Sequence, residues 1–198
     1  MANSSEPFLR VFIAIAVPPD VQQEIGRAQG QLRRNSPPGA IRWTQPEQFH
    51  ITLKFLGDQL SEQVAALEES VSTVCVGLPA LRLSAHGIGF FPNTEKPRVI
   101  WAGAEDTSEQ LAELHRQIED AMRPFVPAET PKRFTGHITL GRFKPGHHAM
   151  IEELLECATV LRRRHFGDWL AGGVEIVRSE PIPAGAMHTP LASCPLAK

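Results

Sequence analysis

The chain has 198 residues, 42% of them hydrophobic and 21% charged, and this composition is typical of an ordinary globular protein. Its formal net charge of -2 argues against a protein that binds long stretches of nucleic-acid backbone, because such binding needs many cationic contacts; a pocket for a single nucleic-acid end stays compatible with it. The three cysteines, Cys75, Cys157 and Cys194, lack zinc-site spacing and are odd in number, which favours a reducing cytoplasm over a disulfide framework.

No segment is predicted to enter a membrane. The apolar run over residues 11–17 is too short to span a bilayer and ends at Pro18, and the first residues lack the basic start of an export signal. We therefore expect a cytoplasmic protein with no membrane partner.

The predicted elements alternate between strands and helices. A near-continuous apolar run predicts a buried strand over 8–17, and apolar residues at helical spacing predict a helix that starts at Asp20. After a short strand over 41–43 and a longer one from His50, Ser61 suits the start of a second helix. The later elements are a hairpin over 81–91 and 98–103, a helix over about 108–125, a strand from His137, a helix over about 150–164, and strands over 166–196.

One short stretch occurs twice. The tetrapeptide His-Ile-Thr-Leu lies at 50–53 and again at 137–140. Each copy is predicted to be a strand, on which alternate side chains share a face. His50 and Thr52 therefore point to one side and the aliphatic residues to the other, and His137 and Thr139 repeat this arrangement. A single copy is more often structural, but packing alone does not require the same polar pair twice.

Two imidazoles in one site suit a reaction in which one group takes a proton while the other gives one, because both titrate near neutral pH. Transfer at a phosphodiester is such a reaction. The hydroxyls of Thr52 and Thr139 can donate to the non-bridging phosphate oxygens. Arg142 carries a planar fork suited to the same oxygens, although strand alternation from His137 predicts that it points to the opposite face.

The paired His-x-Thr motifs resemble those of the two-histidine (2H) phosphoesterase superfamily. The closer resemblance is to its bacterial and archaeal RNA 2',3'-cyclic phosphodiesterases, also called 2'-5' RNA ligase-like proteins. It extends to Arg42-Trp43 and residues 46–49 before the first motif, to residues 55–57 after it, and to Arg142, and it covers nearly the whole chain. It departs from the family at Val177 and His188, where the family often has tyrosine.

This resemblance implies an α+β fold of two pseudo-symmetric lobes, each a mainly antiparallel sheet with helices, facing each other across a central cleft in one domain over 1–198. It implies metal-independent hydrolysis of RNA 2',3'-cyclic phosphate ends to 2'-phosphate, with 2'-5' RNA ligation as the reverse reaction. His137 is then the base and His50 the acid, while Thr52, Thr139 and Arg142 bind the phosphate. We expect no cofactor and a monomer.

Three alternatives stay open. They are a non-catalytic module that binds RNA ends, a metal-dependent hydrolase that uses several of the eight histidines, and a 2H phosphodiesterase for a small cyclic nucleotide. The adjacent His147 and His148 favour an exposed turn over a metal site, because no carboxylate or cysteine stands at ligand spacing. Trp43 is the aromatic side chain we consider for stacking on a base, with core packing as an equal alternative.

Overall fold

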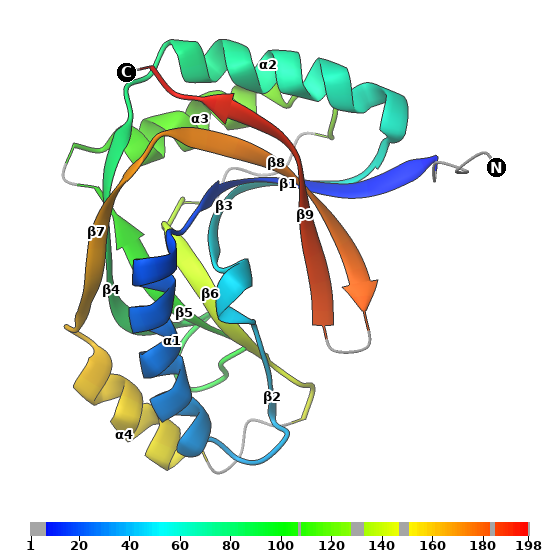
Figure 1. Ribbon diagram of the computed structural model, residues 1–198. Helices are drawn as coiled ribbons and strands as arrows, with labels where there is room; N and C mark the ends of the chain where they lie inside the picture. Colours follow the sequence, from blue (N-terminus) through cyan, green and yellow to red (C-terminus); the bar gives the residue numbers. More distant parts are fainter. Residues whose placement is uncertain (1–6, 107, 128–132, 147–150, 183–184, 198) are drawn as a thin grey trace.

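The protein is described by a computed structural model that covers residues 7–106, 108–127, 133–146, 151–182 and 185–197. In these residues nine strands form one sheet in the order β7-β4-β5-β6-β3-β1-β8-β9, with β2 paired to β6 beside this path (Figure 1). The named strands pair antiparallel throughout. The expected mixed fold with a mainly antiparallel sheet is confirmed. The strands are β1 (Phe8–Ala16), β2 (Ile41–Trp43), β3 (His50–Leu60), β4 (Leu81–Phe91), β5 (Val99–Glu105), β6 (His137–Phe143), β7 (His165–Ala171), β8 (Gly173–Ile182) and β9 (Gly185–Pro195).

The sheet has two halves, each covered by two helices. The half that contains β2, β4, β5, β6 and β7 carries α1 (Pro19–Arg34), which packs on β7, and α4 (Glu152–Leu161), which packs on β4. The other half, with β1, β3, β8 and β9, carries α2 (Val64–Val76) against β8 and β9, and α3 (Gln110–Ala121) against β3. Figure 1 shows the two groups apart, α1 beside α4 and α2 beside α3. We call these the β6 half and the β3 half.

Helix α1 crosses from one half to the other. It follows β1 of the β3 half, yet its buried stripe of Val21, Ile25, Ala28 and Leu32 packs in the β6 half, next to β7 and α4. The stripe has the spacing of an amphipathic helix, as the sequence predicts. Neither half is therefore contiguous in sequence, and the two motif strands are held in one framework.

The two halves meet at one residue pair. Within the described part of the chain, β3 and β6 are joined in register at Ile51 and Ile138, and both side chains are fully buried. The aliphatic faces of both strands enter the main core, with Leu53 and Leu140 beside these isoleucines. The histidines and threonines between them lie on the other side of the sheet, which we call the histidine face.

Several element ends differ from the sequence prediction. The helix expected from Ser61 begins at Val64, after a 3-10 turn over Ser61–Gln63. Helix α4 is shorter than the predicted 150–164, and residue 150 of that prediction lies outside the described ranges. None of the helices in the described ranges is long and apolar enough to cross a membrane.

The junction predicts a large stability effect. Ile138→Ala removes buried aliphatic atoms at the point where the halves meet, and should lower the free energy of unfolding by about 3 kcal/mol in urea denaturation. Val160→Ala is the control, because Val160 is 83% exposed and its truncation should change the free energy by less than about 0.5 kcal/mol. An Ile138→Ala variant as stable as the control would contradict this role.

Candidate active site

The two histidines have the same backbone environment. His50 Nδ1 lies 2.7 Å from the carbonyl oxygen of Gln48, and His137 Nδ1 lies 2.8 Å from that of Thr135. A carbonyl oxygen only accepts, so each Nδ1 carries the hydrogen and donates it to the residue two positions earlier in the chain, just before the strand begins. In the neutral form this leaves Nε2 of each ring as the proton acceptor. The paired motif thus produces two imidazoles that present the same nitrogen for chemistry.

Each imidazole also lies against aromatic rings. The ring centroid of His50 is 4.8 Å from that of Phe12 and 5.2 Å from that of His188. The centroid of His137 is 4.9 Å from that of Phe91 and 6.3 Å from that of Trp101. These rings exclude water from one side of each histidine and leave both half-buried.

Burial keeps both histidines neutral at neutral pH. Desolvation is the main cause that lowers the pKa of His50 to about 4, with further lowering by the nearby charges of His188, His137 and Arg142 against the raising effect of the Gln48 carbonyl. Desolvation also lowers the pKa of His137 below its ordinary value of 6.5, and Arg142 adds to this, while the Thr135 carbonyl raises it. Arg142 lowers the pKa of both His50 and His137, so its charge lies close to the histidine pair.

The threonines complete a local two-fold arrangement. Because Ile51 and Ile138 are antiparallel partners, the residue before one isoleucine faces the residue after the other. Thr139 on β6 therefore lies opposite His50 on β3, and Thr52 on β3 lies opposite His137 on β6. Both threonines are half-buried on the histidine face, and their hydroxyls accompany the imidazoles as the sequence predicts.

The predicted direction of Arg142 is wrong, and a β-bulge is the reason. On β5, Ile100 and Trp101 are consecutive, but their partners on β6 are Gly141 and Thr139, so Leu140 is an extra residue. Direct partners on adjacent strands share a face, and Arg142 is the partner of Val99. Val99 lies two residues from Trp101 on β5, so it points to the same face as Trp101 and its partner Thr139. The bulge therefore returns Arg142 to the histidine face. Gly141 was the available signal, because a glycine inside a strand often marks a bulge.

The same irregularity occurs in the first motif. On β1, Ile13 and Ala14 are consecutive, while their partners on β3 are Lys54 and Thr52, so Leu53 is the extra residue. Phe55 then takes the position on β3 that Arg142 takes on β6. Its side chain is 60% exposed, and its ring centroid is 5.9 Å from that of Phe12. The repeat thus includes the backbone bulge as well as the four motif residues.

Helix α1 holds the second bulge from the core side. The buried side chain of Gln29 donates to the carbonyl oxygens of Leu140, at 2.9 Å, and Thr44, at 2.7 Å. The Leu140 oxygen also accepts from the backbone nitrogen of Thr44, at 2.9 Å. A buried amide that satisfies two carbonyls fixes the bulge and, through it, the direction of Arg142.

Trp43 lies on the core side of the sheet. It is the partner of Gly141 on β6, and a Cβ on Gly141 would come within 3.0 Å of the indole. The half-buried ring packs against the main core. The structure thus brings His50, Thr52, His137, Thr139 and Arg142 to one face and places Trp43 on the other.

His188 is the residue at this site whose place the sequence did not indicate. It lies on β9, with its ring centroid 5.0 Å from that of Phe12 and 5.2 Å from that of His50. Its Nδ1 is buried without a hydrogen-bond partner among the described residues. No local pattern marks it, and its departure from the family tyrosine was the only signal.

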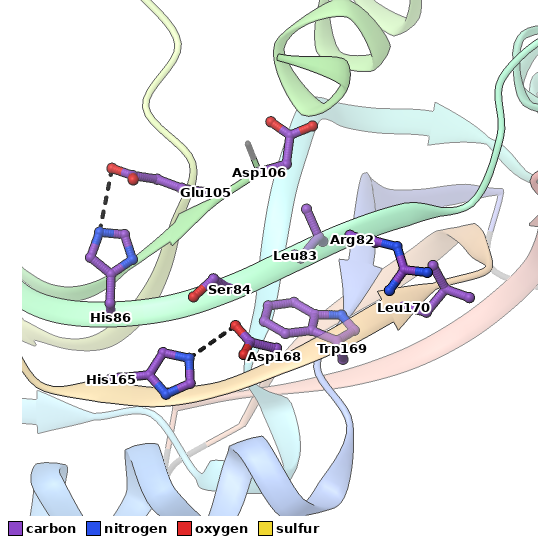
Figure 2. A pocket seen from close by; sticks show the side chains of 10 residues that line it. All are labelled: Arg82, Leu83, Ser84, His86, Glu105, Asp106, His165, Asp168, Trp169 and Leu170. Atoms are coloured by element: carbon purple, nitrogen blue, oxygen red, sulfur yellow. Dashed lines mark hydrogen bonds and ion pairs between the residues drawn. The ribbon is translucent and has the colours of Figure 1, made fainter. Parts of the chain in front are cut away.

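An open pocket of about 650 Å³ lies farther out, over β4, β5 and β7 (Figure 2). It belongs to the histidine face, because His137 and His86 are the partners of Gly103 from the two sides of β5. His86 Nε2 lies 3.4 Å from a carboxylate oxygen of Glu105, and a second imidazole–carboxylate pair stands beside it. Its lining has three carboxylates and one arginine, and it includes none of the predicted site residues. The lining residues are Arg82, Leu83, Ser84, His86, Glu105, Asp106, His165, Asp168, Trp169 and Leu170.

Within the described ranges, no three His, Cys, Asp or Glu side chains are grouped closely enough to hold a metal ion. His147 and His148 lie outside those ranges.

Known proteins match both the sequence and the fold. The model of the LigT-like phosphoesterase family matches residues 15–101. An RNA 2',3'-cyclic phosphodiesterase of Archaeoglobus fulgidus is 31% identical over 92% of this chain and 98% of its own, and one of Methanothermobacter thermautotrophicus is 29% identical over 91% and 95%. The crystal structure of TT0787 of Thermus thermophilus has a TM-score of 0.76 at 28% identity, covering 95% of this chain and 98% of its own. The structure of E. coli LigT with 3'-AMP has the same TM-score at 21% identity, covering 96% and 99%.

The fold and the paired histidines are those of a 2H phosphoesterase. More particularly, the chain belongs to the family of LigT-like phosphoesterases that includes these RNA 2',3'-cyclic phosphodiesterases.

Gln29 should matter for activity as well as stability. Gln29→Leu removes both donors from buried carbonyls and should lower the free energy of unfolding by about 1–3 kcal/mol. Because the bulge then loosens, kcat/KM for a cyclic phosphate ester should fall at a temperature where the variant is fully folded. Gln117→Leu is the matched control, since Gln117 is a half-buried helix glutamine that donates to Glu113 on the surface of α3. Equal activity of the two variants would show that Gln29 does not position Arg142.

Proposed function

We propose that this protein hydrolyses RNA 2',3'-cyclic phosphate ends to 2'-phosphates, without a metal ion. The observation that carries the proposal is the pair of half-buried histidines, each with Nδ1 committed to a carbonyl and Nε2 available, beside two threonines and Arg142 on one face. The names of the relatives support the substrate class. The same site run backwards joins the ends in a 2'-5' linkage, and in water hydrolysis dominates.

The reaction needs one proton acceptor and one proton donor. Water attacks phosphorus opposite O3', its proton passes to the Nε2 of one histidine, and the P–O3' bond breaks as the other histidine protonates O3'. The product carries a 2'-phosphate and a free 3'-hydroxyl. Thr52, Thr139 and Arg142 hold the non-bridging oxygens as negative charge builds on them.

The burial of the histidines bears on their roles. For His50 to act as acid, its pKa would have to rise from about 4 to near 7, which takes roughly 4 kcal/mol of favourable interaction with the bound phosphate. Arg142 is the one charged neighbour that lowers the pKa of His137, whereas His188, His137 and Arg142 all lower that of His50. We therefore assign His50 as base and His137 as acid, the reverse of the order that the family resemblance implied.

The cellular setting stays part of the proposal. The protein is proposed to act as a monomer in a reducing cytoplasm, and the three free cysteines support the compartment. RNA 3' ends are preferred as substrate over small cyclic nucleotides, because a second exposed arginine, Arg42, is the direct strand partner of Arg142.

The first test is the product made from an oligonucleotide with a 2',3'-cyclic phosphate end, in excess chelator. The wild type should form the 2'-phosphate, and His50→Ala and His137→Ala should each lower kcat by about 10²–10⁴-fold, because each removes one proton-transfer group. His115→Ala is the control, since His115 lies on α3, stacked on Phe134. Binding without turnover by the wild type would favour the RNA-end module, and loss of activity in chelator would favour the metal-dependent hydrolase.

A substrate with sulfur in place of the bridging O3' tests the order of the two histidines. A thiolate leaves without protonation, so loss of the acid should cost far less on this substrate than loss of the base. We expect the sulfur substrate to restore the rate of His137→Ala and not that of His50→Ala; the opposite result would return the roles to the order that the resemblance implied. With the oxygen substrate, kcat/KM should fall as the pH rises through 7, because the pKa of the acid, His137, lies below 6.5 in the free enzyme.

A further inference from the structure

A second arginine stands beside Arg142. Arg42 on β2 and Arg142 on β6 are direct antiparallel partners, so their Cβ atoms are about 4.5–5.5 Å apart and their side chains share a face. Both side chains are exposed. Among the described residues, neither guanidinium forms an ion pair or a side-chain hydrogen bond.

This pair lies on the histidine face. The Leu140 bulge places Arg142 there, and Arg42 follows as its partner. The neighbours of Arg42 on β2, Ile41 and Trp43, pack into the main core on the other side. Lys144, whose backbone nitrogen donates to the carbonyl of Ala40, alternates with Arg142 and is exposed as well.

Like charges placed directly opposite each other on a sheet are destabilising. A chain with a net charge of -2 has enough carboxylates to pair with these arginines, but on this face they stand elsewhere. The pocket of Figure 2, at the other edge of the β6 half, contains Glu105, Asp106 and Asp168 against Arg82 alone. On β8, Arg178 is already paired with Glu180 at 3.0 Å. A polyanion on the histidine face is therefore attracted toward β2.

We propose that Arg42 binds the phosphodiester on the 5' side of the terminal nucleotide while Arg142 binds the reacting cyclic phosphate. The two forks start one strand apart and are free to engage successive phosphates of one chain. Arg42 then makes the enzyme selective for oligonucleotide ends over cyclic mononucleotides. This inference rests on the proposed function, and it names the substrate class of the same site.

The test compares binding of a trinucleotide that ends in a 2'-phosphate with binding of the corresponding mononucleotide, so that it does not depend on turnover. Arg42→Ala should lower the affinity for the trinucleotide by about tenfold, the loss expected for one charge-assisted contact. The affinity for the mononucleotide should stay within about twofold of that of the wild type. Arg42→Lys should retain part of the trinucleotide affinity. The salt dependence of trinucleotide binding should become shallower in Arg42→Ala, by about 0.7 in the slope of log K against log [salt].

Arg33→Ala is the matched control, because it removes one exposed positive charge at the end of α1, on the helix side of the sheet. Arg33→Ala should change the affinity for neither ligand. The proposal would be overturned if Arg42→Ala lowered the affinity for both ligands equally, or for neither. Hydrolysis is then measured with the trinucleotide and the mononucleotide that carry a 2',3'-cyclic phosphate in place of the 2'-phosphate. A wild type that binds the trinucleotide through Arg42 but hydrolyses neither cyclic phosphate would refute the proposed reaction and leave the role of Arg42 standing.

Discussion

The antiparallel contact between Ile51 and Ile138 is the constraint on which the site depends. Both side chains are fully buried, so the strands that carry them have one register in which their aliphatic faces enter the core. That register sets each histidine beside the threonine of the other strand. If one of the two strands slipped by one residue, its own imidazole would turn toward the core and its isoleucine away from it. The hydrophobic packing that joins the two halves therefore also places the proposed catalytic groups.

The repeat supplies one backbone device and two different chemistries. Each motif strand has its extra residue at the leucine of His-Ile-Thr-Leu, and each places the second residue beyond it on the histidine face. On β6 this residue is Arg142, the cation proposed to bind the phosphate. On β3 it is Phe55, an exposed ring beside Phe12. The supports differ too, because Gln29 holds the bulge on β6, while Lys54 pairs with Glu119 of α3 at 2.9 Å on β3.

Local pattern was sufficient for the strands, the helices and the two histidine–threonine pairs, because period-2 and helical spacing are read from neighbouring residues. It failed at Arg142, since a bulge adds one residue and reverses the alternation behind it, and only Gly141 hinted at this. It also could not show that α1 crosses to the other half, or that Gln29, far from β6 in sequence, holds Leu140. These contacts depend on tertiary packing. The same holds for His188, which reaches His50 from the last strand.

Burial gives the empty site a definite charge state, and this bears on how the reaction begins. An imidazole half-buried among rings and close to arginine is stable as the neutral base. In the proposed reaction, an enzyme without substrate therefore lacks the protonated histidine that releases O3'. A cyclic phosphate carries one negative charge. Bound beside Arg142, it offsets the cation and stabilises a proton on one of the two histidines, while the other stays neutral. In the proposed mechanism the substrate thus completes the acid–base pair, and an adjacent anionic linkage held at Arg42 would add to the same effect.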